Sequence, residues 1–109
     1  MSILRIWRGF TTPEKADAYI HLLRTTHFPN LAARRIPGFR RIELATRPDG
    51  DRVEVRTLMW FDSLEAVKAY AGPDYERAAL APSAETLLTE PDLTVAHFTL
   101  EAEADALPA

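Results

Sequence analysis

The dipeptide Asp49-Gly50 is the feature that most constrains the fold of this chain. It stands in the segment RPDGDR, between two runs in which apolar and polar residues alternate. Asp-Gly between two such runs is typical of a β-hairpin, because glycine accepts the positive backbone φ that tight turns require. We therefore predict neighbouring antiparallel strands over residues 39–46 and 53–61.

A helix is predicted before this hairpin and another after it. Thr12-Pro13-Glu14 is typical of a helix start, since it offers a hydroxyl cap, a proline at the first turn and an acid at the positive end. We expect Pro29 to end this first helix. Asp62 and Glu65 are spaced as a capping box for the second helix, which Gly72-Pro73 ends.

Two further alternating runs, residues 3–10 and 93–100, predict the first and last strands. The order strand, helix, strand, strand, helix, strand is typical of an α+β, ferredoxin-like βαββαβ fold with one four-stranded antiparallel sheet. We assign residues 1–100 to this single domain and expect residues 101–109, EAEADALPA, to form a disordered acidic tail.

The strands carry large apolar side chains on both faces, whereas two main helices cover only one face. Met59 and Phe61 point to one side of the third strand, and Leu58 and Trp60 point to the other. An uncovered apolar sheet face usually marks an interface. We therefore predict a homodimer that packs sheet against sheet.

Charge and composition restrict the class of partner. The 109 residues include 16 acidic and 13 basic side chains, and three of the acids lie in the tail. The remaining body is close to neutral, which does not favour nucleic-acid binding. No apolar stretch is long enough for a membrane span or a signal peptide, and the sequence has no cysteine, so we expect a cytoplasmic protein.

Metal binding and nucleophilic hydrolysis are poorly supported. His21 and His27 are six residues apart on the first helix, so their side chains diverge. The sequence has no Gly-rich phosphate loop, and Ser63 and Ser83 lack a nucleophile-elbow context. We expect neither a metal nor a cofactor.

Two histidines are candidates for a catalytic base, the role in which histidine is used most often. His97 lies within the last strand, and its face cannot be chosen from the sequence, because both sides of that strand are partly apolar. His27 continues the stripe of Tyr19 and Leu23 on the first helix, which directs it toward the sheet. The alternative for each is a structural role in packing, capping or the dimer contact.

Three aromatic residues and one arginine are candidates for substrate binding. Trp60 ends a strand, where pocket rims are common, and Tyr19 and Tyr70 lie on the two helices. We expect Trp60 to pack under the second helix, beside a pocket that it shares with His27. Arg41 belongs to a cluster of arginines that either orients an anionic oxygen or is a solvated strand end. The aromatic residues have the alternative of ordinary core packing.

Several segments together resemble the antibiotic biosynthesis monooxygenase-like family of dimeric α+β barrels. They are LRIWRGF, IPGFRRIEL, RPDGDRVEVRTLMWFDSLEAVKAYAGPDYERA and TVAHFTL, and the resemblance covers residues 3–100. That family includes cofactor-free oxygenases of phenolic substrates, haem-degrading enzymes and members without known activity. Haem-degrading members carry an asparagine in the first strand and a histidine in the second helix, and both are missing here.

The resemblance thus implies a cofactor-independent monooxygenase of a small aromatic or polyketide-like substrate. Such a substrate would lose a proton to His97 or His27 and then supply the electrons to oxygen itself. The alternative is a non-catalytic dimeric domain that binds a ligand or acts as an accessory. Fold alone does not choose between them.

Overall fold

The predicted hairpin is present in the computed structural model, which describes residues 2–106. Strands β2 (Phe39–Asp49) and β3 (Arg52–Phe61) are antiparallel and are joined by a turn in which Gly50 has a φ of 64°. Strand β1 (Ile3–Thr11) pairs with β3 on one side and with β4 (Ala96–Thr99) on the other. The sheet order is β2-β3-β1-β4, and all pairings are antiparallel.

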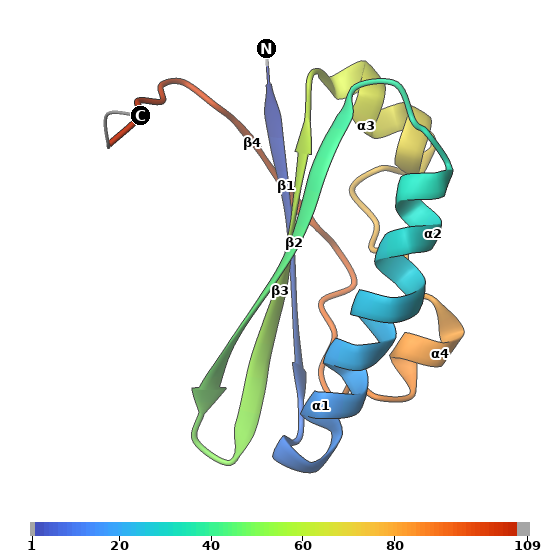
Figure 1. Cartoon of the computed structure of the whole chain (residues 1–109), viewed down its shortest axis with the longest axis vertical. Helices are drawn as coiled ribbons and strands as arrows, with labels where there is room; N and C mark the ends of the chain where they lie inside the picture. Colours follow the sequence, from blue (N-terminus) through green and yellow to red (C-terminus); the bar gives the residue numbers. More distant parts are fainter. Residues whose placement is uncertain (1, 107–109) are drawn as a thin grey trace.

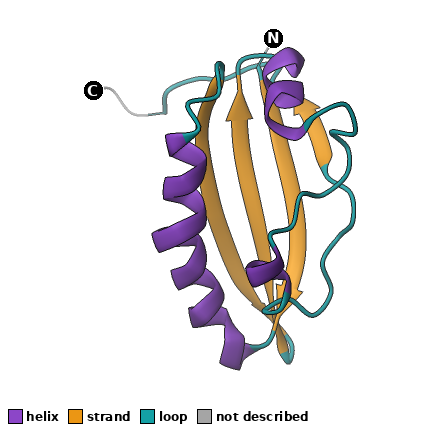
Figure 2. Cartoon of the chain, turned by 90° about the vertical axis from the view of Figure 1, so that its right-hand side faces the viewer, coloured by secondary structure: helices purple, strands orange, loops and turns teal. Residues whose placement is uncertain are grey.

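The helices lie on one face of this sheet (Figures 1 and 2). A continuous helical rod comprises α1 (Pro13–Leu22), the π-helical segment η1 (Leu23–His27) and α2 (Phe28–Ala33). The second crossover contains α3 (Leu64–Ala71) and the short α4 (Pro82–Glu85). The prediction of an α+β, ferredoxin-like fold with a four-stranded antiparallel sheet is confirmed. Within residues 2–106, every helix is too short or too polar to span a bilayer.

Pro29 does not end the first helix, contrary to the prediction. The rod continues to Ala33, and the turn just before the proline widens, so that the Phe28 amide bonds to the carbonyl of Leu23. Proline in a regular α-helix clashes with the carbonyl four residues earlier, and a wider π turn relieves that crowding. The same π turn carries His27, so it sets the direction of that side chain.

The cap of α3 is Ser63 and not Asp62. The Ser63 hydroxyl accepts a hydrogen bond of 3.2 Å from the Ala66 amide. Asp62 instead accepts a 2.7 Å bond from Nε of Arg40, an ion pair that holds the pKa of the Asp62 carboxyl below its usual range. A partner from β2 therefore removes Asp62 from the capping role.

Strand β4 is shorter than the predicted run of residues 93–100. Thr94 forms a bridge with Arg77, and the Leu93 carbonyl accepts from the Ala78 amide. Residues 93–95 therefore pair with the loop that follows α3, and Leu93 remains 72% exposed.

The apolar side chains between sheet and helices form two clusters. One is centred on Trp7, Tyr19, Leu23 and Val55 under the helical rod. The other contains Ile3, Met59, Phe61, Ala66 and Val67 under α3. The predicted alternation along β1 and β3 is therefore observed, and one set of alternate residues is left on the side without helices.

Six apolar residues form a patch on that open side, which we call the open-face patch. In the strand register Leu4 lies between Trp60 and Phe98, and Ile6 lies between Leu58 and Ala96. Phe98 is 52% exposed in the single chain. Charged groups border the patch, among them Glu54, which is buried between Arg47 and Arg56.

Substitution of Gly38 is expected to be costly. This glycine has a φ of 81°, and a Cβ there would lie 2.7 Å from the Cβ of Ala66 in the core. Gly38→Ala should therefore combine a backbone cost of about 1–2 kcal/mol with an overpacking cost of about 1–3 kcal/mol. Urea unfolding measures the sum.

Gly50→Ala is the matched control, because Gly50 also has a positive φ but no heavy atom within 4 Å of the place that a Cβ would take. It should lower the free energy of unfolding by the backbone cost alone. Equal losses of unfolding free energy in the two variants would show that the close approach of the new Cβ at position 38 to Ala66 costs nothing.

The acidic tail makes no regular structure over residues 101–106, and these residues are exposed. The chain leaves the sheet on the side away from the helices (Figure 1). Part of the predicted disordered segment, residues 107–109, lies outside the described residues.

Deleting residues 101–109 should change the free energy of unfolding by less than ~1 kcal/mol, as for ordinary surface changes. A larger loss in urea unfolding would show that the tail docks on the folded domain.

Candidate functional site

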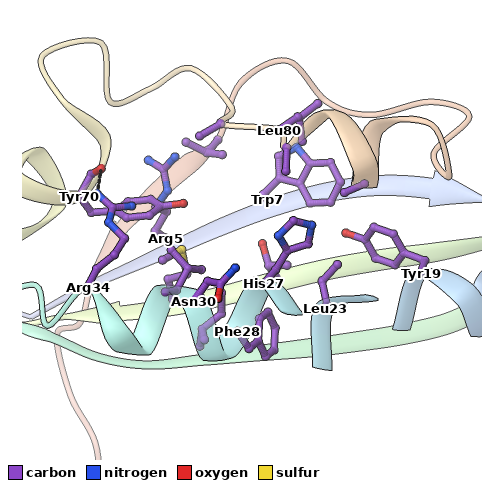
Figure 3. Close-up of a pocket in the computed structure, with 18 of the residues that line it drawn as sticks. Arg5, Trp7, Tyr19, Leu23, His27, Phe28, Asn30, Arg34, Tyr70 and Leu80 are labelled. Carbon is purple, nitrogen blue, oxygen red and sulfur yellow. Dashed lines mark hydrogen bonds between the residues drawn. The ribbon is translucent and has the colours of Figure 1, made fainter. Parts of the chain in front are cut away.

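A cavity of about 450 Å³ lies between the sheet and the helical rod. Its walls come from β1 and β3 on one side, from α1, η1 and α2 on another, and from the chain around α4 (Figure 3). Most of the lining is apolar, with Trp7, Leu23, Phe28, Met59 and Leu80 among the larger side chains. The volume is within the range of about 300–1,000 Å³ usual for small-molecule sites.

His27 presents a buried nitrogen without a partner. Its Nε2 atom has no hydrogen bond to any of the described residues, and the side chain lines the cavity. The π turn places the ring in the middle of the cavity, next to Trp7 and Leu23 (Figure 3). A buried ring nitrogen without a hydrogen-bond partner is unfavourable, so a polar group of a bound ligand that hydrogen-bonds to it would be stabilised there.

Tyr19 adds a protonated hydroxyl to the same end of the cavity. Only 2% of the residue is exposed, and burial raises the pKa of Tyr19 to about 12. The hydroxyl therefore remains a potential hydrogen-bond donor at neutral pH. It points along the cavity toward His27 (Figure 3).

Arg5 is the other unusual polar group of the cavity. It is only 3% exposed, although it carries a guanidinium. Its Nη1 lies 2.5 Å from the Tyr75 carbonyl oxygen and 2.9 Å from Nε2 of His97, and its Nη2 lies 3.5 Å from the Arg77 carbonyl oxygen. Within residues 2–106, no Asp or Glu side chain forms an ion pair with it. Burial lowers the pKa of Arg5, yet an arginine side chain stays charged in proteins.

A second guanidinium lies close to the same end of the cavity. The guanidinium carbons of Arg5 and Arg34 are each 5.3 Å from the centroid of the Tyr70 ring. Arg34 also donates a 3.3 Å hydrogen bond to the Tyr70 carbonyl (Figure 3). The cavity thus has a cationic end at Arg5, Arg34 and Tyr70, and His27 and Tyr19 lie toward its other end.

His97 is on the helix side of β4, opposite Arg5, but it does not line the cavity. It lies behind Arg5, and its Nε2 accepts the hydrogen bond from the guanidinium. An accepting nitrogen carries no proton, so His97 is neutral in this arrangement. Burial and the charge of Arg5 lower the pKa of His97, in agreement with that state. The ring contacts the Tyr75 ring edge-on, and the geometry suits the positioning of Arg5.

Trp60 and Arg41 lie on the opposite side of the sheet from the cavity. This corrects the prediction that Trp60 borders the pocket and that Arg41 orients an anionic oxygen there, and it leaves for Arg41 the alternative of a solvated strand end. The Trp60 indole donates a 2.8 Å hydrogen bond to Glu43, and the guanidinium of Arg41 stacks 4.9 Å from its ring centroid. Strand alternation alone assigns Trp60 to the face opposite Met59 and Phe61, and a position at a strand end does not override it. Trp60 therefore belongs to the open-face patch.

The structure brings together His27, Tyr19 and Tyr70 from the predicted set, and it adds Arg5, Trp7 and Arg34. Trp7 lies on the face of β1 that it shares with Ile3, and its indole donates a 2.8 Å hydrogen bond to the Asp92 carbonyl. Arg5 follows from the same alternation, because it lies between Ile3 and Trp7 on the buried face. Among residues 2–106, no group of three acidic or histidine side chains is arranged to hold a metal ion.

No protein-family profile and no curated protein matches the sequence. Three-dimensional comparison does find relatives in shape. A candidate antibiotic biosynthesis monooxygenase from Bacillus cereus has a TM-score of 0.69 at 13% identity, with 100% of both chains covered. A variant of SnoaB, a cofactor-independent oxygenase from Streptomyces nogalater, has a TM-score of 0.57 at 21% identity, over 94% of this chain and 95% of SnoaB.

A dimeric ferredoxin-like protein from an uncultured marine organism has a TM-score of 0.55 at 13% identity. The match covers 96% of this chain and 99% of that protein. Likeness at such low identities shows the fold and leaves the function to the site. As the resemblance in its sequence predicted, this chain has the fold of the antibiotic biosynthesis monooxygenases.

Proposed function

We propose that this protein is a cofactor-independent oxygenase of a small phenolic or polyketide-like substrate. The single observation that carries the proposal is the unpartnered Nε2 of His27 in a largely apolar cavity. A base in such a place can take a proton from a phenol or from a carbon next to a carbonyl group. The fold shared with SnoaB, a cofactor-independent oxygenase, supports the same class of reaction.

The reaction balances without an added reductant for an anthrone-type CH₂ group. His27 takes a proton from that carbon, and the resulting anion gives its electrons to O₂, so that a C–O bond forms. His27 returns the proton to the peroxide, and loss of water then leaves a carbonyl group where the CH₂ stood. The Tyr19 hydroxyl can donate a hydrogen bond to the substrate oxygen on which negative charge develops.

Oxygen uptake tests this proposal directly. Purified protein, treated with a chelator, is mixed with anthrone-type and simple phenolic substrates, and O₂ consumption and the quinone product are followed together. We expect one molecule of product for each molecule of O₂ consumed. The rate of O₂ consumption should exceed the rate without protein. Binding of these substrates without any uptake would contradict the oxygenase.

A ligand-binding domain without catalysis is the second candidate. It is favoured by the position of His97, which bonds to Arg5 and leaves His27 as the single histidine on the cavity wall within residues 2–106. Calorimetry on the same substrates distinguishes the two functions, because binding without turnover supports this candidate.

We further propose that the protein is a homodimer through the open-face patch. Its six apolar side chains lie on three adjacent strands and are bordered by charged groups, which is the usual anatomy of an interface. The dimeric ferredoxin-like protein of the same fold supports this assembly. Each subunit would keep its own cavity on the far side of its sheet.

A further inference from the structure

We infer that the cationic end of the cavity binds a carboxylate group of the ligand. Arg5 is the basis of this inference, because a buried charge is normally paired with an opposite charge. Its three contacts are to two backbone carbonyls and a neutral imidazole, and within residues 2–106 it has no carboxylate partner. The inference rests on that part of the proposed function that makes the cavity the ligand site.

The surroundings of Arg5 increase the positive character of this end. The guanidinium of Arg34 lies against the same Tyr70 ring, and Arg34 likewise has no ion pair with an acidic side chain in the described chain. Two cations at one end of a largely apolar cavity attract an anion, whereas they add little to the affinity for a neutral ring. The contacts of Arg5 with Tyr75, Arg77 and His97 fix its guanidinium plane before any ligand binds.

A carboxylate suits this place better than a phenol does. The planar guanidinium fork matches the two oxygens of a carboxylate. A carboxylate is also ionised at neutral pH without help, whereas a free phenol is not. We therefore assign the ligand to the aromatic carboxylic acids, with the acid at Arg5 and the aromatic system extending toward His27 and Trp7 (Figure 3).

This assignment gives the cavity a direction. The carboxylate lies at the cationic end, so the reacting carbon or phenol lies near His27 at the other. An aromatic substrate without the acid would bind less tightly and in more than one orientation. The carboxylate thus contributes affinity and fixes the orientation of the ligand, and His27 carries out the proton transfer.

Three probes of nearly equal shape test the assignment on the unmodified protein: 2-naphthoate, 2-naphthamide and 2-naphthol, with affinities from calorimetry at pH 7.5. We expect 2-naphthoate to bind about tenfold or more tightly than either neutral probe, the size typical of a hydrogen-bonded ion pair. Equal affinities for the three probes, or tighter binding of 2-naphthol, would overturn the inference.

Two variants locate the preference. Arg5→Met should abolish it, whereas Arg8→Met should keep it, because Arg8 lies on the same strand but on the open side, paired with Asp92. If Arg5→Met does not fold, Arg34→Gln and Arg5→Lys replace it. Arg34 is at an exposed position, so Arg34→Gln should reduce the preference for 2-naphthoate by a smaller factor. A preference that is unchanged in both variants would overturn the assignment.

The outcomes separate this inference from the oxygenase proposal. A preference for 2-naphthoate together with no oxygen uptake by any substrate supports the carboxylate site and contradicts the oxygenase. Oxygen uptake with equal affinities for the three probes supports the oxygenase and contradicts the carboxylate site.

Discussion

His27→Ala is expected to lower the rate of oxygen uptake by ~100- to 10,000-fold, the usual contribution of a positioned general base. Within residues 2–106, the substitution removes the one buried side-chain nitrogen that has no hydrogen-bond partner, and its residue lines the cavity. Substrate affinity should change much less, because the apolar walls and the cationic end remain. Steady-state oxygen uptake gives the rate, and calorimetry on the same sample gives the affinity.

His21→Ala is the matched control for this prediction. His21 lies on the same helical rod but is exposed, and it does not line the cavity. Its substitution should leave both rate and affinity unchanged. If His27→Ala turns over at the rate of the unmodified protein, proton transfer by His27 is excluded and the histidine has a packing role.

Leu58→Glu is expected to convert the dimer into monomers. Leu58 is opposite Ile6 near the centre of the open-face patch, and two-fold symmetry brings two copies of the new carboxylate into one interface. Burying an unpaired charge costs about 3–5 kcal/mol, so the dissociation constant should rise by at least ~100-fold. Light scattering should show a fall from twice the chain mass to the chain mass of 12.3 kDa.

Ala69→Glu provides the comparison, since Ala69 is exposed on α3, on the helix side of the sheet. It should remain dimeric. Circular dichroism should be the same for both variants, because Leu58 contributes to neither core cluster. An unmodified protein that scatters as a 12.3 kDa particle would contradict the dimer itself.

The fold could be predicted because its signals are local. Asp49-Gly50 specifies the hairpin, Thr12 caps the first helix as predicted, and alternation along β1 and β3 separates the two faces. Two of the errors occurred where a distant partner competes with a local signal. Asp62 pairs with Arg40 and does not cap α3. Residues 93–95 hydrogen-bond to the loop at residues 76–78 and do not extend β4.

The site was predicted less completely, for two physical reasons. Helical periodicity placed Tyr19 and His27 on the sheet side of the rod, where they line the cavity. The role of Arg5 depends on acceptors 70 or more residues away, at Tyr75, Arg77 and His97, which no sequence period contains. Trp60 was placed by its strand end, although its parity already assigned it to the other face.

The central claim is that the cavity between the sheet and the helical rod is the ligand site, and the two tryptophans report on it separately. Trp7 lines the cavity, whereas Trp60 lies on the open face. A titration with 1,8-dihydroxyanthraquinone, followed by the two indole N–H signals in a proton–nitrogen NMR spectrum, distinguishes the two places. We predict that the Trp7 signal shifts in proportion to saturation while that of Trp60 stays in place. A shift of the Trp60 signal with an unchanged Trp7 signal would contradict the claim.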